Sequence, residues 1–288
     1  MTIRFTKMHG LGNDFIVIDA VSQQVNLQPD MIQQLSRRDT GIGFDQCLLV
    51  EASKDSETDF FYRIYNVDGK EVGQCGNGAR CLARFIHQYN LSKKETIAVS
   101  TSTTKMILKL NKDHSVTVKL EIPKLNPVDI PLKVNKLEEY YQLPLITGVA
   151  KVHAINVGNP HAVTIVDNLV GIDLANLGKE ISEHALFPEQ TNAGFMKIIN
   201  PSHLQLRVYE RGCGETQACG SGAVAAAAVG RLWHKMAEEI MVSLPGGDLR
   251  INWPDVKGPI YLTGPATFVY EGVLMTTNFY DFGKNKDS

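Results

Sequence analysis

The spacing of apolar residues alternates between strand-like and helix-like patterns in the first half of the chain. Residues 3–8 and the apolar run 15–18 predict two strands joined by a Gly-rich turn. Residues 29–38 predict a short helix with Pro29 in its first turn, where a backbone N–H has no helical partner in any case. Further strands are predicted at residues 46–50, 60–65, 96–100, 105–110 and 115–120.

A second helix is predicted after Cys75, because Ala79, Leu82, Ala83 and Ile86 follow one another at helical spacing. The same order of elements then starts again, with a helix predicted at residues 172–184. The last predicted helix, residues 223–236, is apolar nearly all round and indicates a helix buried on all sides. Strands of this half are predicted at residues 152–157, 163–166, 195–199, 204–209, 249–253, 260–263 and 267–275.

A proline-rich segment separates the two halves. Residues 122–145 contain four prolines, and the strand and helix patterns restart after them. A chain of 288 residues also suggests two domains, at about 150 residues each. We therefore expect one domain at residues 1–119 plus 265–288 and another at residues 120–264.

The two halves are also related in sequence. Residues 63–79 and 207–223 align without gaps and share seven identities in seventeen positions, including Cys75 with Cys219. The other identities outside the cysteine turn are Arg63 with Arg207, Tyr65 with Tyr209 and Glu71 with Glu215. The repeat is too long for a solenoid unit and predicts two similar domains, each presenting one cysteine in the same position. We interpret Glu71 and Glu215 as structural support for the turns.

Composition excludes several classes of protein. Hydrophobic residues make up 43% and charged residues 21% of the chain, as in ordinary globular proteins, and a net charge of −2 gives no sign of a nucleic-acid or membrane surface. Apolar runs stay well below the roughly 18–20 residues of a membrane span. Residues 1–9 lack an apolar signal-peptide core, so we expect a cytoplasmic protein. Five cysteines, an odd number, argue against a disulfide framework.

Each repeated cysteine lies between a strand and a helix and is followed by Gly-x-Gly. Such a sulfur lies beside the unpaired N–H groups at a helix N-terminus, which predicts a lowered pKa for Cys75 and Cys219. The glycines let a ligand approach the backbone, and the same N–H groups can hold a substrate carboxylate. Two such sites on matched domains suggest a symmetric pair that faces a cleft.

Two opposed thiols suit inversion of a carbon stereocentre. A thiolate removes the proton from one face and a thiol returns a proton to the other, so the reaction is a racemisation or an epimerisation. The competing interpretation for any single cysteine is a small buried hydrophobic residue, which fits Cys47, Cys81 and Cys213. A zinc site is disfavoured, because five residues separate Cys75 from Cys81 and Cys213 from Cys219, whereas structural zinc sites use two to four.

With these motifs the sequence resembles the diaminopimelate epimerase family across essentially its whole length. Small departures from the family's motifs lie at Val157 and Cys213, at positions that vary. The resemblance is carried by residues 7–15 (KMHGLGNDF), 43–46 (GFDQ), 66–80, 158–161 (GNPH), 192–195 (NAGF) and 209–223.

The resemblance implies the fold and the activity. The implied fold is two pseudo-symmetric α/β domains, each a curved mixed sheet wrapped around a central helix, with the active site in the cleft between them. The implied reaction interconverts LL- and meso-2,6-diaminopimelate, in lysine and peptidoglycan precursor biosynthesis, without pyridoxal phosphate, other cofactors or metal. The acid–base pair is Cys75 and Cys219. The resemblance also implies a homodimer that uses the region of Tyr270.

The motif residues also have a chemical interpretation. Arg211 can bind the distal substrate carboxylate bidentately, and Glu210 can face an ammonium group. The amides that can hold an amino-acid head without net charge are Asn13, Asn66, Asn77, Asn159 and Asn192. By resemblance, further residues line the substrate site or tune the thiols. The lining residues are Gln46, Gly76, Gly220 and Ser221, and the tuning residues are His161 and Glu210.

Two alternatives remain open from the sequence. A proline or hydroxyproline racemase-like enzyme would use the same paired cysteines, although Arg211 beside Glu210 favours a substrate with a second charged end. A metal-binding or redox module would use the cysteines as ligands or as a thiol pair.

Overall fold

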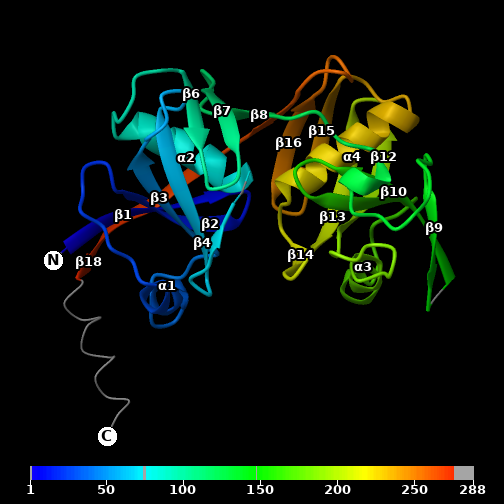
Figure 1. The fold of residues 1–288 in the computed structure, drawn as a ribbon, viewed down its shortest axis with the longest axis horizontal. Coiled ribbons are helices and arrows are strands. Elements are labelled where there is room, and N and C mark those ends of the chain that lie inside the picture. Colours follow the sequence, from blue (N-terminus) through cyan, green and yellow to red (C-terminus); the bar gives the residue numbers. More distant parts are fainter. Residues whose placement is uncertain (1, 74–75, 147, 276–288) are drawn as a thin grey trace, which may run out of the picture. The chain divides into compact units, whose positions relative to one another are not determined.

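The computed structural model describes residues 2–73, 76–146 and 148–275, which form two compact units (Figure 1). The first unit runs from the N-terminus to Val118 and resumes at Pro265, whereas the second comprises Lys119–Gly264.

The first unit contains a mixed sheet in the order β18, β1, β2, β3, β4, β6 and β7. The β2–β3 and β4–β6 pairs are parallel and the other pairs are antiparallel. The short strand β5 (Glu71–Val72) pairs with β4, and β8 (Val116–Leu120) ends this part of the chain. The strands of the sheet are β1 (Thr2–Gly10), β2 (Asn13–Asp19), β3 (Gln46–Ala52), β4 (Phe60–Asn66), β6 (Thr96–Ser100), β7 (Lys105–Leu110) and β18 (Thr267–Met275).

The sheet of the second unit has the order β9, β10, β11, β12, β13, β15, β16 and β17. From β10 to β16 the pairings run antiparallel, parallel, antiparallel, parallel, antiparallel, as they do from β1 to β7 in the first unit. The predicted duplication is therefore confirmed in the fold. The strands are β9 (Tyr141–Leu145), β10 (Gly148–Asn156), β11 (Pro160–Ile165), β12 (Asn192–Asn200), β13 (His203–Glu210), β15 (Glu239–Leu244), β16 (Gly247–Asn252) and β17 (Ile260–Gly264).

Each unit has a central helix that follows the repeated cysteine turn. In the second unit α4 (Gly220–Trp233) contacts β10, β11, β12, β13, β15, β16 and β17, so the sheet curves around it. Residues 222–230 of this helix are all buried, as its apolar pattern predicts. The small side chains of residues 225–228 allow the strands to approach closely. In the first unit α2 (Gly76–Gln88) contacts β1, β2, β3 and β7.

A shorter helix covers the outer face of each sheet. Helix α1 (Pro29–Ser36) packs Ile32 and Leu35 against Ile16 and Ile18 of β2. Because α2 contacts the other face of β2, residues 15–18 are buried on both sides and form a continuous apolar run. In the second unit α3 (Leu174–Ser182) contacts β9, β12, β13 and the short strand β14 (Gly214–Thr216).

Four of the described strands were not predicted from the sequence: the short β5 and β14, and the longer β9 and β15. Strand β9 lies within the proline-rich segment, where the 3-10 turn Pro127–Asp129 also lies, and Pro144 pairs with Val149. Proline is tolerated there because β9 pairs only with β10 among the described strands, so its missing N–H faces away from the sheet. Strand β15 buries alternate residues, and its pattern was overlooked beside the strongly apolar α4.

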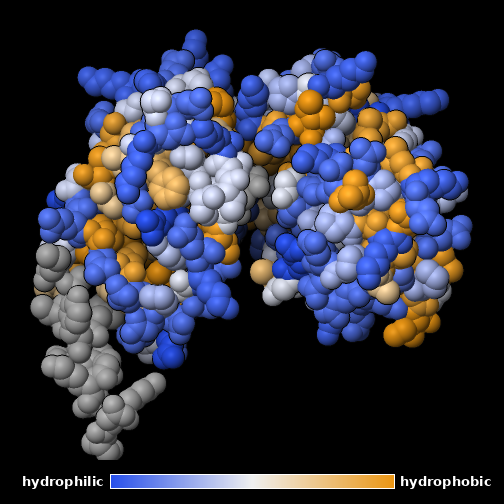
Figure 2. All heavy atoms as spheres, viewed as in Figure 1, coloured by the Kyte–Doolittle hydropathy of each residue, from blue (hydrophilic) through white to orange (hydrophobic). Residues whose placement is uncertain are grey.

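Hydrophilic residues cover much of the visible face of both units in Figure 2, with smaller hydrophobic areas between them. Of the helices that the structure describes, none has the length and apolar character required to cross a membrane. The sequence predicts a frayed tail at residues 285–288, and this tail lies outside the described residues.

Candidate active site

Cys219 is the N-cap residue of α4. Its Sγ accepts a hydrogen bond from the Gly222 N–H at 3.3 Å and lies 3.5 Å from the Ser221 Oγ. Gly222 must be glycine, because a Cβ there would lie 2.9 Å from the Val208 side chain and 3.2 Å from the Cys219 sulfur. The first turn of α4 therefore holds the thiol at the end of the helix where backbone N–H groups lack helical partners.

The pKa of the Cys219 thiol is raised well above its usual range. Burial is the largest cause and the negative charge of Glu210 the second, and these outweigh the hydrogen bonds from Ser221 and Gly222 that favour the thiolate. The sequence-based expectation of a lowered pKa is therefore wrong for Cys219. Cys219 is a protonated thiol at neutral pH and is suited to donate a proton.

Glu210 connects Cys219 to the β13–β14 hairpin. Its carboxylate accepts a hydrogen bond from the Thr216 Oγ1 at 2.5 Å, and burial raises the pKa of Glu210. The hairpin is braced by a bidentate ion pair in which Arg207 donates to Glu215 at 2.7 and 2.8 Å. Thr216 was missed in the sequence analysis, because its counterpart in the repeat, Val72, has no polar side chain to signal a role.

The first unit contains a looser version of this brace. Arg63 lies 3.9 Å from Glu71, and the pairing of Tyr65 with Glu71 matches that of Tyr209 with Glu215. The repeat-matched acidic residues therefore have the structural role that we predicted for them.

His161 on β11 lies between two of the predicted substrate-binding amides. It is fully buried, with Nε2 3.0 Å from the Asn159 Oδ1 and 3.4 Å from the Asn192 Nδ2. The shorter contact requires a proton on Nε2. Burial and the positive charge of Arg211 lower the pKa of His161 to about 3, so the ring is neutral at physiological pH. Its Nδ1 is buried and has no hydrogen-bond partner among the described residues.

Asn192 and Arg211 are joined through the backbone. The Asn192 side chain donates to the Pro160 carbonyl at 3.3 Å and accepts from the Arg211 main-chain N–H at 2.9 Å. The Arg211 guanidinium is exposed and donates to the Glu189 carbonyl at 2.7 Å. Asn159, His161, Asn192 and Arg211 thus form one group in the second unit.

The amides predicted in the first unit lie in two hydrogen-bonded pairs. The Asn77 side chain, in the first turn of α2, donates to the Asn13 Oδ1 at 3.1 Å. Gln46 donates to the Asn66 Oδ1 at 2.8 Å, and its own Oε1 is buried without a partner among the described residues. Cys75, the predicted partner of Cys219, lies outside the described residues.

Two sets of charged residues support these amides and were not predicted. Arg80, which is fully buried in α2, donates to the Asn77 Oδ1 at 3.0 Å and to the Pro265 carbonyl at 3.1 Å. The second set fixes the loop before β3, where Arg38 donates to Asp14 and Asp45, and Asp45 accepts from Asn13. Arg80 stands at the end of a quoted motif, so its motif position was the available signal.

The remaining cysteines differ in burial. Cys47 and Cys81 are buried, as expected of small hydrophobic side chains, and burial raises the pKa of Cys47 to about 12. Cys213 is exposed, so its interpretation as a buried hydrophobic residue is wrong. The turn between β13 and β14 carries it to the surface.

Comparison with known proteins identifies the family. The family model described as diaminopimelate epimerase matches residues 5–125 and 153–269. A diaminopimelate epimerase from Legionella pneumophila subsp. pneumophila (strain Philadelphia 1) is 56% identical over 277 residues, which cover 96% of this chain and 100% of the relative. The chain belongs to the diaminopimelate epimerase family. The relative from the Corby strain has the same identity and coverage.

Solved structures share the fold at much lower identity. A phenazine biosynthesis protein of the PhzF family from Bacillus anthracis has a TM-score of 0.68 and 14% identity, covering 96% of this chain and 99% of its own. A hydroxyproline epimerase from Agrobacterium vitis has a TM-score of 0.67 and 13% identity, with 95% and 92% covered. These likenesses show the two-domain fold alone. The sequence identity therefore favours the diaminopimelate epimerase interpretation over a proline racemase-like enzyme.

Proposed function

We propose that this epimerase interconverts LL- and meso-2,6-diaminopimelate by moving the proton at one Cα between Cys75 and Cys219. The observation that carries the proposal is the buried, protonated Cys219 thiol at the N-terminus of α4, at one of two repeat-matched cysteines. The substrate is supported by 56% identity over the full length of relatives that bear this enzyme's name.

The proposed reaction breaks and forms one C–H bond. A thiolate removes the α-proton as the C–H bond breaks, and the second thiol delivers its proton to the opposite face of the same carbon. The negative charge spreads onto the substrate carboxylate in the transition state. Main-chain N–H groups of Gly220 and Ser221, in the first turn of α4, are suited to stabilise that charge. No electrons are transferred to another group, and the product differs only in configuration.

The two cysteines have different surroundings in the sequence repeat. Glu210 raises the pKa of Cys219, whereas the position that matches Glu210 in the first half is the neutral Asn66. We propose that Cys219 is the thiol and Cys75 the thiolate in the free enzyme. After Cys219 has donated its proton, the nearby carboxylate makes its thiolate a stronger base for the reverse reaction.

The amides and Arg211 are proposed to hold the two ends of the substrate. His161 is neutral, so it acts by orienting Asn159 and Asn192 and not by carrying charge. Gln46 offers a buried Oε1 without a partner among the described residues, which suits a substrate ammonium group. Arg211 is exposed and suits the distal carboxylate, which proline lacks. The other proposed substrate contacts are Asn13, Asn66, Gly76, Asn77 and Glu210.

Solvent isotope incorporation tests this function. The full chain is incubated in D₂O with LL-diaminopimelate or with L-proline, in the presence of a chelator, and the products are analysed by mass spectrometry and chiral chromatography. We expect one deuterium at Cα of the meso product and no exchange into proline. Exchange into proline but not into diaminopimelate would support the racemase-like alternative.

Replacing Glu210 tests the proposed control of Cys219. In Glu210→Gln the pKa of Cys219 falls, because the negative charge that disfavours the thiolate is gone. Alkylation of Cys219, followed by peptide mass spectrometry, then extends to lower pH, and kcat falls by about tenfold or more because the thiolate is a weaker base. Glu215→Gln is the matched control, since Glu215 pairs with Arg207 on the same hairpin. Equal alkylation profiles for both variants contradict the proposal.

Assembly into a homodimer through the Tyr270 region, and a cytoplasmic location, remain predictions. The dimer prediction is supported by four exposed hydrophobic residues on β18, which are Val269, Tyr270, Val273 and Met275. If β18 forms the interface, Tyr270→Glu buries a charge there and shifts the protein to the monomer in sedimentation velocity. Ile107→Glu is the control, because the Ile107 side chain on β7 is also exposed, and it should leave the sedimentation coefficient unchanged. A wild-type monomer would overturn the prediction.

A further inference from the structure

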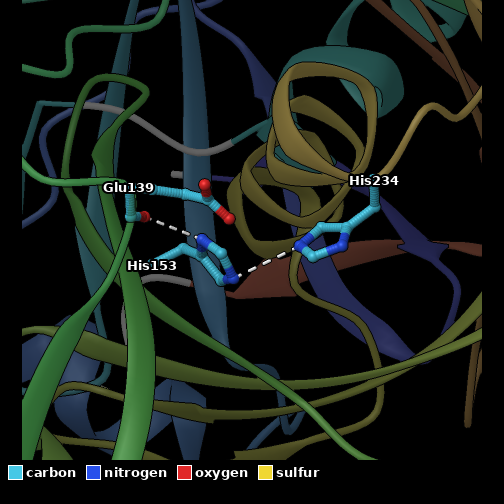
Figure 3. A group of neighbouring side chains, drawn as sticks. All are labelled: Glu139, His153 and His234. Atoms are coloured by element: carbon cyan, nitrogen blue, oxygen red, sulfur yellow. Dashed lines mark hydrogen bonds between the residues drawn. The ribbon is translucent and has the colours of Figure 1, made fainter.

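Two histidines and a glutamate form a cluster in the second unit, away from the cysteine turn. His153 on β10 is buried, His234 directly after α4 is half-buried, and Glu139 before β9 is exposed. One nitrogen or oxygen atom from each of the three lies within 4.8 Å of the others. Figure 3 shows the Glu139 carboxylate beside the two imidazole rings.

Local contacts fix the orientation and the tautomer of His153. Its Nδ1 lies 2.8 Å from the main-chain carbonyl of Glu139, so Nδ1 carries the proton and the lone pair is on Nε2. The ring stacks on Trp233, with the centroids 5.1 Å apart and the planes at 23°. Histidines that bind metals almost always donate their second N–H to a carbonyl or carboxylate in this way.

The distance between the two rings matches a metal site. The Nε2 atoms of His153 and His234 are 3.3 Å apart. At Zn–N distances of about 2.0–2.1 Å and a tetrahedral angle, two nitrogen ligands lie about 3.3 Å apart. A carboxylate oxygen of Glu139 lies within 4.8 Å of one ring nitrogen of each histidine, which exceeds the tetrahedral spacing by about 1.5 Å at most. Because the Glu139 side chain is exposed, it is free to change rotamer toward the two nitrogens.

We propose that Glu139, His153 and His234 bind a divalent transition-metal ion of the Zn²⁺ type, with solvent as the fourth ligand. Imidazole and carboxylate are the ligands that such ions take, and a negative carboxylate offsets part of the ion's charge. The ion ties the segment before β9 to β10 and to the end of α4. Lys151, whose ammonium rests 3.5 Å from the centre of the Tyr140 ring, contributes an opposing positive charge nearby.

This site is separate from the epimerase chemistry. Cys219 and His234 cap opposite ends of α4, whose 14 residues span about 20 Å at 1.5 Å per residue. The ion therefore takes no part in proton transfer. Its role is to fix the structure of the second unit, whichever substrate the enzyme binds.

Titration with Co²⁺, followed by competition with Zn²⁺, tests the site on the full chain after treatment with a chelator. We expect one ion per chain with visible absorption bands of nitrogen and oxygen ligands. His234→Gln and Glu139→Gln should each weaken binding by at least about tenfold and leave epimerase activity intact. Glu138→Gln, at the neighbouring exposed position, and His203→Gln, a half-buried histidine of the same unit, are controls that should bind as the wild type does.

Several outcomes overturn the proposal. A sulfur-to-cobalt charge-transfer band that persists in His234→Gln shows that some of the five thiols bind the ion instead. Equal binding in the cluster variants and the controls also excludes the site. Absence of binding leaves a hydrogen-bonded histidine pair, in which His234 donates to His153.

Discussion

Cys219→Ala is expected to lower epimerisation by about 10³-fold or more, because general acid–base groups contribute about 10²–10⁴-fold. The variant should fold normally, since the change removes one sulfur with its contacts to Ser221, Gly222 and Glu210 and leaves the backbone of α4 unchanged. Inversion requires a proton donor on one face and an acceptor on the other. Cys75→Ala should therefore have an equally large effect. Turnover is measured from both isomers, with circular dichroism as the check on folding.

Isotope exchange distinguishes a variant that has lost only one of the two cysteines from one that has lost all proton transfer at Cα. If Cys75 still works in Cys219→Ala, it can remove and return a proton on its own face. We then expect deuterium to enter one isomer with retention of configuration. Cys213→Ala is the matched control, because Cys213 is exposed on the neighbouring turn and should keep wild-type turnover. Near-normal inversion in a folded Cys219→Ala enzyme would contradict the proposal that both Cys75 and Cys219 transfer protons.

The duplicated part of the fold could be predicted because it depends on patterns within short segments of the sequence. The apolar pattern of residues 223–229 predicted the buried helix, and the matched segments 63–79 and 207–223 predicted the duplication. Strand β9 was missed because its evidence is not local. It depends on pairing with β10, which makes the position of Pro144 acceptable.

The site shows the same division between local and distant effects. The position of Cys219 at a helix N-terminus followed from the Gly-x-Gly turn. Its pKa was predicted in the wrong direction, because the dominant effects are burial within the unit and the charge of Glu210 on another element. The cluster of Glu139, His153 and His234 has no spacing motif at all, since packing of α4 against β10 brings it together.

Arg80→Met is expected to destabilise α2 by about 2 kcal/mol. The change removes the hydrogen bonds that Arg80 donates to the Asn77 Oδ1 and to the Pro265 carbonyl, at about 1–3 kcal/mol for each buried bond, and part of this is offset by removal of a buried charge. Because Asn77 also contacts Asn13, activity should fall with it. Hydrogen-exchange mass spectrometry should show peptides of residues 76–88 exchanging about 30-fold faster, the equivalent of 2 kcal/mol.

A fluorescence signal from the second unit and a second arginine variant serve as controls for this test. Both tryptophans, Trp233 and Trp253, lie in the second unit, so their fluorescence reports on that unit while exchange reports on α2. Arg84→Met is the matched control, because Arg84 also joins α2 to residue 266 but is only half-buried. Its loss should cost about 1 kcal/mol, because water can reach the groups left behind. If the two variants are equally destabilised, the buried position of Arg80 has no special role, and Asn77 is held by its contact with Asn13 and by the helix itself.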